Sequence, residues 1–212
     1  MNKTLHYLFD PLCGWCYGAT PAVSGLLGAP GVVVKLLPTG LFSGEGARPM
    51  DDDFATFAWA NDQRIERLTG QSFTDHYRDQ VLGDRRQTFD SGPATIALTA
   101  VSLTDPSREL EALKAMQRAR YVEGRDVTSM ATLASLLNDL GLELAAARLE
   151  QPDAELLAFN GTRIGRAQAL MREFSARGVP TLIAEVGAKR WVIDPGAVYS
   201  NPRALVNQLE TT

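Results

Sequence analysis

Both cysteines of this 212-residue chain lie in one Cys-x-x-Cys motif, at Cys13 and Cys16. An apolar run ends at Phe9, the turn formers Asp10 and Pro11 interrupt it, and an apolar helical pattern follows the motif. This order predicts a strand, a short turn and a cysteine pair at the start of a helix. Side chains three residues apart in a helix are neighbours, so the two sulfurs can approach disulfide distance and the motif favours thiol–disulfide exchange.

The predicted helix start gives the two cysteines different roles. The first turn of a helix leaves backbone N–H groups without partners and carries the positive end of the helix dipole. Both effects stabilise a thiolate at Cys13, which we therefore expect to be the exposed, attacking sulfur. Cys16 lies one turn further along the helix. We expect it to be the more buried thiol that resolves the intermediate.

Two other interpretations of the cysteine pair are an inert buried pair and half of a zinc site. Zinc needs about four ligands, and besides the cysteines the chain offers only His6 and His76. Neither histidine has a ligand spacing with the motif, so we expect no metal and no cofactor. The sequence context favours a redox pair over inert cysteines.

The composition is that of an ordinary globular protein. The hydrophobic share is 45% and the charged share 22%, and the length is sufficient for a sizeable core. A net charge of −4 argues against a nucleic-acid partner. No apolar run is long enough to cross a membrane, and only residues 1–3 precede the first strand, without a secretory signal. We therefore expect a cytoplasmic protein, in which such a pair is reduced at rest.

The rest of the pattern predicts an α/β protein with helices on a mixed sheet. Residues 32–37 form a β-branched apolar run, expected to be a strand parallel to the first, and residues 38–49 form a Gly-rich loop. Asp51 and the two aspartates after it are expected to cap a helix. Helical periodicity then continues to about residue 177, the last helix starting near Asp153.

After this helical block the sequence pattern changes from helical periodicity to short apolar runs. Gly178 to Thr181 lead into two apolar runs, 182–186 and 190–193, separated by a short turn. This pattern predicts a β-hairpin. An irregular stretch and a last amphipathic helix over Pro202 to Leu209 are expected to follow.

These residues resemble a known family. Cys13-Gly14-Trp15-Cys16 after an apolar strand, with Gly178-Val179-Pro180-Thr181 before a hairpin, resembles the thioredoxin fold. The helical block between the two halves resembles the DsbA family. Three stretches are similar to its branch of FrnE-like proteins and predicted disulfide isomerases: Asp90–Ala94, Arg120–Asp126 and Leu133–Leu142.

The resemblance implies a thioredoxin-like mixed sheet with a large all-helical insertion. Residues 1–40 and 165–212 would form the thioredoxin-like domain, and residues 41–164 the helical insertion domain. Pro180 would be a cis-proline facing the cysteines, and Val179 would offer backbone groups to an extended substrate. The alternative for Pro180 is an ordinary trans proline that opens a strand.

By this resemblance the protein would be a thiol:disulfide oxidoreductase or disulfide isomerase. Cys13 would attack a disulfide, a mixed disulfide would form, and Cys16 would resolve it. The partners would be protein or small-molecule disulfides and thiols, with the glutathione or thioredoxin system supplying electrons. One alternative is a glutathione-dependent kappa-class transferase or hydroxychromene-carboxylate isomerase, although those relatives generally have serine at the first motif position. Another is a chaperone-like binding module with incidental cysteines.

The residues between the cysteines depart from the strongly oxidising relatives, which have Pro-His there. Gly14 and Trp15 offer no charge or ionisable donor to the Cys13 thiolate. Trp15 is expected either to contact substrates or to pack against the loop 38–49.

This departure predicts a reducing couple. We expect the Cys13–Cys16 potential to lie nearer the roughly −270 mV of thioredoxin than the roughly −120 mV of the periplasmic oxidant. The reason is that a stabilised thiolate is what makes such a pair oxidising, and no cationic side chain between the cysteines adds to the helix terminus. Equilibration in glutathione buffers, thiol trapping and mass measurement give the value. A potential near that of the oxidant would contradict this expectation.

Overall fold

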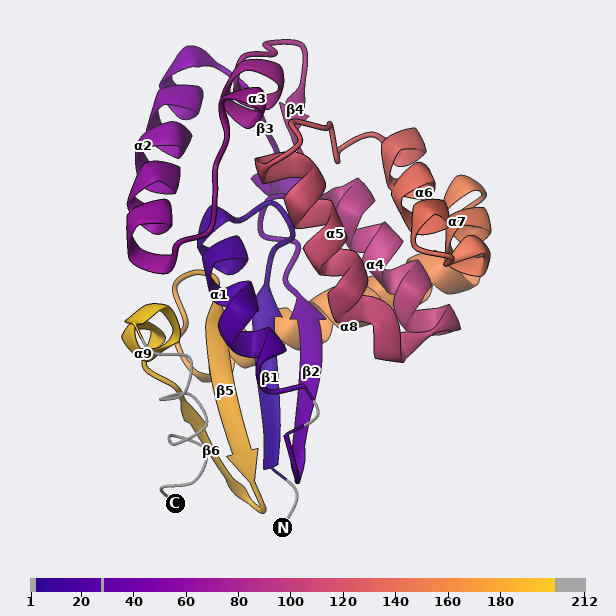
Figure 1. Cartoon of the computed structure of the whole chain (residues 1–212). Helices are drawn as coiled ribbons and strands as arrows, with labels where there is room; N and C mark the ends of the chain where they lie inside the picture. The colour runs from indigo at the N-terminus through magenta and orange to yellow at the C-terminus, as the bar shows by residue number, and fades with distance from the viewer. Residues whose placement is uncertain (1–2, 28, 201–212) are drawn as a thin grey trace.

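The structure is a computed structural model that describes residues 3–27 and 29–200 (Figure 1). Within this part of the chain the main sheet has four strands in the order β2-β1-β5-β6. β1 (Lys3–Phe9) pairs parallel with β2 (Val32–Pro38) and antiparallel with β5 (Thr181–Val186). β5 pairs antiparallel with β6 (Lys189–Val192). The predicted mixed sheet, parallel pair and hairpin are therefore confirmed.

The sheet carries a helix on each face. Leu5 and Tyr7 of β1 are buried in the cluster that includes α1 (Gly14–Ser24), whereas Leu8 is buried in a second cluster with α8 (Ala154–Glu173). This follows from the alternation of side chains along a strand. In Figure 1, α1 lies in front of the strands and α8 behind them. Because both faces of β1 are covered, the strand reads as a nearly continuous apolar run.

A helical block separates β2 from α8, as the resemblance implied. Helices α4 to α7 gather on the side of the sheet beyond β2 (Figure 1). The block contains α2 (Asp52–Thr69), α3 (Asp75–Tyr77), α4 (Gly92–Thr104), α5 (Glu109–Tyr121), α6 (Met130–Asp139) and α7 (Glu143–Glu150). The expected cap of α2 is present, since the side chain of Asp51 accepts from Phe54 N at 2.8 Å. The domain boundaries at 40/41 and 164/165 stay a prediction, and α8 runs through residue 165 without a break.

Three features differ from the sequence expectations. The loop after β2 contains a two-residue strand, β3 (Arg48–Pro49), paired with β4 (Thr88–Phe89). α9 (Pro195–Ser200) occupies the stretch expected to be irregular. Elements this short show no period in the sequence. α8 ends before the predicted position, ahead of the left-handed Ser175 with φ 52°, and the helix expected over 202–209 falls outside the described residues.

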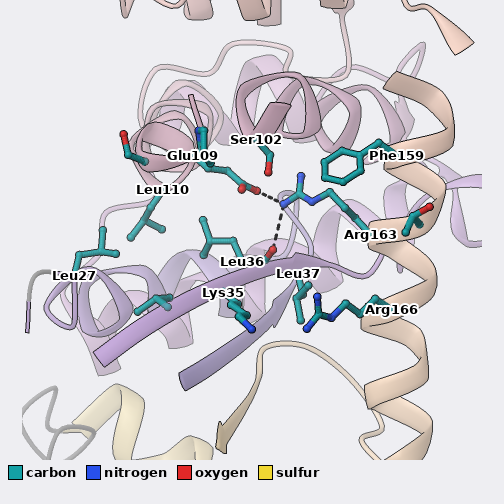
Figure 2. A pocket seen from close by; sticks show the side chains of 14 residues that line it. Leu27, Lys35, Leu36, Leu37, Ser102, Glu109, Leu110, Phe159, Arg163 and Arg166 are labelled. Atoms are coloured by element: carbon teal, nitrogen blue, oxygen red, sulfur yellow. Dashed lines mark hydrogen bonds and ion pairs between the residues drawn. The ribbon is translucent and has the colours of Figure 1, made fainter. Parts of the chain in front are cut away.

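A buried ion pair joins α8 to the sheet and to the helical block. Arg163 of α8 pairs with Glu109 of α5, and the two residues are 6% and 5% exposed. Arg163 also donates to Leu36 O of β2 and to Thr99 Oγ1 of α4, both at 3.1 Å. Figure 2 shows this guanidinium extending from α8 to the Glu109 carboxylate and the Leu36 carbonyl. These residues line a cavity of about 420 Å³. Since these partners satisfy the charge and the donors of Arg163, the interaction is structural.

Removal of one partner should destabilise the fold. Glu109→Gln leaves the guanidinium buried without a counter-charge, which is expected to lower the free energy of unfolding by about 3–5 kcal/mol. The matched control is Glu111→Gln, which removes an exposed partner of Arg108 and should cost less than about 1 kcal/mol. Urea unfolding followed by circular dichroism measures both values. Equal losses in the two variants would contradict the structural role.

Candidate active site

The turn between β1 and α1 is held by a buried carboxylate. Asp10 is fully buried, and its Oδ1 accepts from Leu12 N at 3.0 Å. Its Oδ2 accepts from Phe42 N at 3.1 Å and from the Ser91 hydroxyl at 2.7 Å. Burial raises the pKa of Asp10, and these donors oppose the rise. The sequence indicates only a turn at Asp10, but in the structure Asp10 ties the cysteine motif to the loop after β2 and to the start of α4.

Cys13 occupies the N-cap position of α1, as predicted, and both cysteines are free thiols. Cys13 is 7% exposed and Cys16 is fully buried. The predicted order of exposure is confirmed, but the expectation of an exposed Cys13 is wrong. Its sulfur lies 3.6 Å from Val179 O and lines a cavity formed largely by the helical block. Burial, with the neighbouring Cys13 thiol as a second cause, raises the pKa of Cys16 well above its usual range. Cys16 therefore stays protonated unless another group removes its proton.

The structure brings the second predicted motif to the first. The Val179–Pro180 peptide bond is cis, and Cys13 Sγ donates to Val179 O at 3.6 Å. Pro180 is buried, and the Thr181 hydroxyl donates to Gly178 O at 2.8 Å. The prediction of a cis bond beside Cys13 is confirmed.

The side chain of Trp15, inside the motif, is half-buried and packs against α9. Its ring makes an edge contact with Tyr199 at 5.2 Å between centroids, and the Arg64 guanidinium lies 5.6 Å from its centroid. The Tyr199 hydroxyl donates to Trp15 O at 3.2 Å. The ring also lines a cavity together with Leu41 and Phe42 of the loop after β2. The sequence does not predict this contact, because α9 has only six residues and shows no helical period.

That cavity, of about 450 Å³, opens beside Cys13 and Gly14. Its size is within the range of small-molecule sites. Most of its wall comes from the helical block and the loop before it, so the site is shared by the sheet-bearing part of the chain and the insertion. The apolar side chains of its wall include Leu41, Phe42, Phe54, Phe57, Ile65 and Phe89.

Asp62 is the main residue of this site that the sequence analysis missed. It lies on α2, is 5% exposed and lines the cavity. Its Oδ2 accepts from the Tyr77 hydroxyl at 2.9 Å, and a Cβ at Gly14 would collide with its Oδ1. Glycine inside the motif therefore leaves room for this carboxyl. The available signal was its position, four residues after Ala58 and three before Ile65, within the apolar stripe of α2.

Burial raises the pKa of Asp62 to about 7, against the opposing effects of the Tyr77 hydrogen bond and the Arg120 charge. Arg120 is 1% exposed, with its guanidinium carbon 5.4 to 5.7 Å from the ring centroids of Tyr77, Phe89 and Tyr121. Its charge also lowers the pKa of Asp10. In the sequence Arg120 belongs only to a stretch similar to the family, and its place as a buried cation acting on two carboxyls depends on the tertiary structure.

The two histidines do not join the cysteines. His6 Nε2 pairs with Glu185 Oε2 at 2.8 Å across the neighbouring strands β1 and β5. Among the described residues, no three His, Cys, Asp or Glu side chains group as metal ligands would.

In the same part of the chain, no helix combines the length and the apolar character needed to span a bilayer.

No protein-family model and no curated protein matches the chain. Solved structures match over nearly its whole length. The cytosolic disulfide reductase DsbM from Pseudomonas aeruginosa is 34% identical with a TM-score of 0.87, covering 99% of this chain and 100% of that one. A proposed protein disulfide isomerase from Nitrosomonas europaea is 25% identical with a TM-score of 0.80, covering 98% and 97%. A 2-hydroxychromene-2-carboxylate isomerase, 15% identical with a TM-score of 0.59 over 97% and 95%, shares the fold alone.

A thioredoxin-like mixed sheet with a helical insertion and paired thiols at a helix N-terminus defines the class of thioredoxin-fold disulfide oxidoreductases. The chain belongs to the DsbA family of this class. The resemblance stated from the sequence is thereby confirmed at the level of fold and family.

The difference between the two sulfurs predicts selective alkylation. Brief treatment of the reduced protein at neutral pH should modify Cys13 at least about tenfold faster than Cys16, because Cys16 is buried and its thiol holds its proton. Mass spectrometry of the digested protein measures both rates. The control is the protein in urea, where the two rates should converge. Equal labelling in the folded protein, or faster labelling of Cys16, would contradict this assignment.

Proposed function

We propose that the protein is a thiol:disulfide oxidoreductase that reduces disulfides with the Cys13–Cys16 dithiol. The observation that carries this proposal is the position of Cys13. Its sulfur lies at the N-terminus of α1, 3.6 Å from Val179 O and on the wall of the cavity, with Cys16 buried one turn further along. One sulfur is thus available to a substrate and the other is shielded from it.

The reaction has two exchange steps. The Cys13 thiolate attacks one sulfur of the substrate disulfide, that disulfide bond breaks, and a mixed disulfide forms while one thiol leaves. Cys16 then gives up its proton and attacks Cys13 Sγ, which forms the Cys13–Cys16 disulfide and releases the second thiol. Two electrons pass from the dithiol to the substrate.

Residues 179–180 and the motif itself would position the substrate. Val179 is partly exposed beside Cys13, and an extended substrate can pair with backbone groups at such a position. Pro180 would hold this segment against the sulfurs. Gly14 and Trp15 would contact the substrate from the cavity side, since both line the cavity.

Two observations support a reducing role and glutathione as electron partner. Gly14 and Trp15 put no charge between the cysteines. The DsbM structure that matches over the full chain is of a cytosolic disulfide reductase, and DsbM with GSH also matches at 33% identity. By this similarity the protein works in the cytoplasm, and glutathione regenerates the dithiol from the Cys13–Cys16 disulfide.

A glutathione-dependent isomerase is the second candidate, favoured by the apolar cavity beside Cys13 and by the fold shared with the hydroxychromene-carboxylate isomerase. A second cysteine has no role in that chemistry. The presence of Cys16 directly behind Cys13 therefore favours the oxidoreductase, and the two candidates differ in their need for Cys16.

Single cysteine variants separate these functions. In insulin reduction with glutathione as reductant, Cys13→Ser should lose all catalysed activity, because no attacking sulfur remains. Cys16→Ser should form the mixed disulfide but lose at least about 90% of turnover, since the resolving thiol is gone. Circular dichroism of both variants controls for folding, and mass measurement detects the trapped adduct. Full activity of Cys13→Ser would contradict the proposal, and full activity of Cys16→Ser would favour the isomerase.

A further inference from the structure

Asp62 is a buried titratable group that the two exchange steps above do not use. Its carboxyl lies against Gly14, on the wall of the cavity that Cys13 also lines. The Tyr77 hydroxyl donates to Oδ2, and Oδ1 lies where a Cβ at Gly14 would be. Asp62 is only 5% exposed, and burial favours the protonated form of its carboxyl.

The charged and titratable groups around Asp62 come from four elements. Tyr77 of α3 donates to it, and Arg120 of α5 lowers its pKa by charge. Tyr121 of α5, Cys13 at the start of α1 and Arg48 of β3 share the cavity wall. Arg120 is always protonated. The two tyrosines are buried and their pKa values are raised well above the usual range, so both stay neutral. Arg120 is thus the buried cation that acts on Asp62, whereas Arg48 is exposed to solvent.

This one cation faces more than one acidic group. Asp10, whose pKa Arg120 also lowers, accepts hydrogen bonds from two backbone N–H groups and the Ser91 hydroxyl, which favour its ionised form. Within the described residues Asp62 accepts from one donor, the Tyr77 hydroxyl, and burial raises its pKa to about 7. Asp62 is therefore a carboxyl that still holds a proton near neutral pH, on the wall of the cavity that Cys13 also lines.

We propose that Asp62 is a catalytic acid that gives its proton to the thiolate leaving the substrate disulfide, a role that rests on the proposed function of Cys13. The Cys13 thiolate attacks one substrate sulfur, the substrate S–S bond breaks, and the departing sulfur takes the proton from the Asp62 carboxyl. The products of this step are the mixed disulfide, a neutral thiol and the Asp62 carboxylate. The carboxylate recovers a proton from water after the thiol has left.

The apolar cavity beside Cys13 is the reason that a proton transfer would help the reaction. Attack on a disulfide sends the leaving sulfur away from Cys13, and the cavity beside Cys13 offers it a place next to Asp62. The wall there is largely apolar, including Phe42, Phe54 and Ile65, so a leaving thiolate would be poorly solvated. A proton from Asp62 removes that cost. The benefit should be large for a basic thiolate and small for an acidic one.

The test compares two neutral disulfides whose thiols differ in acidity, in wild type and Asp62→Asn. Bis(2-hydroxyethyl) disulfide releases a basic aliphatic thiolate, and 4,4′-dithiodipyridine releases an acidic aromatic one. Asp62→Asn should slow the first single-turnover exchange with the aliphatic disulfide by about 10- to 100-fold. The rate with the aromatic disulfide should change by less than about twofold. Asp53→Asn, an exposed position on the same helix, is the matched control and should change neither rate.

The outcomes separate the two proposals. If Asp62→Asn slows both disulfides equally, or slows neither, the acid role is overturned while the dithiol function stands. If wild type reduces neither disulfide, the proposed function itself fails. The ratio of aliphatic to aromatic rate in wild type should also fall as pH rises through about 7, where Asp62 loses its proton. A ratio that falls in the same way in Asp62→Asn would overturn the inference.

Tyr77→Phe provides a second variant if Asp62→Asn does not fold. The Tyr77 hydroxyl favours the ionised carboxyl, so its removal should raise the pKa of Asp62. Asp62 then stays protonated to higher pH, and the fall in the rate ratio should move to higher pH by about 0.5 to 1 unit. If the rate ratio of Tyr77→Phe falls at the same pH as that of wild type, or at a lower pH, the assignment is overturned.

Discussion

The buried carboxylate of Asp10 is the interaction on which the geometry of this site depends. It lies where β1 ends and accepts hydrogen bonds from the turn before Cys13, from the loop after β2 and from Ser91 at the start of α4. Each hydrogen bond to a charged acceptor contributes about 1.5–3 kcal/mol, and the loss of the carboxylate would leave its donors unpaired. One side chain thus holds the sheet, the cysteine motif and the helical insertion together.

A second constraint is the burial of charged groups near the dithiol. Burial raises the pKa of both Asp10 and Asp62, and the charge of Arg120, which is buried among aromatic rings, opposes both rises. Three hydrogen-bond donors also oppose the rise at Asp10, whereas within the described residues only the Tyr77 hydroxyl donates to Asp62, whose pKa is about 7.

The helical insertion completes the site as well as enlarging the protein. The sheet, α1 and residues 178–180 supply the sulfurs and the backbone beside them, and α2 with the loop before it supplies most of the cavity wall. The buried Glu109–Arg163 pair fixes α8 to β2 and to the helical block away from the cysteines (Figure 2). The cavity beside Cys13, which is only 7% exposed, is therefore walled mainly by the insertion.

The sequence alone determined the features that depend on local chemistry. The cysteine pair at a helix start, the parallel strand 32–37, the Asp51 cap and the hairpin after Pro180 all follow from spacing, periodicity and capping within short segments. The two motifs and the helical block between them also identified the family. Their order along the chain is a property of the sequence, so it can be recognised without knowing any tertiary contact.

Only the tertiary structure decided the features that depend on distant segments. Asp62 reads as a polar residue of an amphipathic helix until Gly14, Tyr77 and Arg120 are seen around it. Trp15 could not be placed without α9, which is too short to show a period. The low exposure of Cys13 and the raised pKa of Asp62 both depend on side chains that pack around them from distant segments. Such burial is a property of the folded chain that no local sequence pattern encodes.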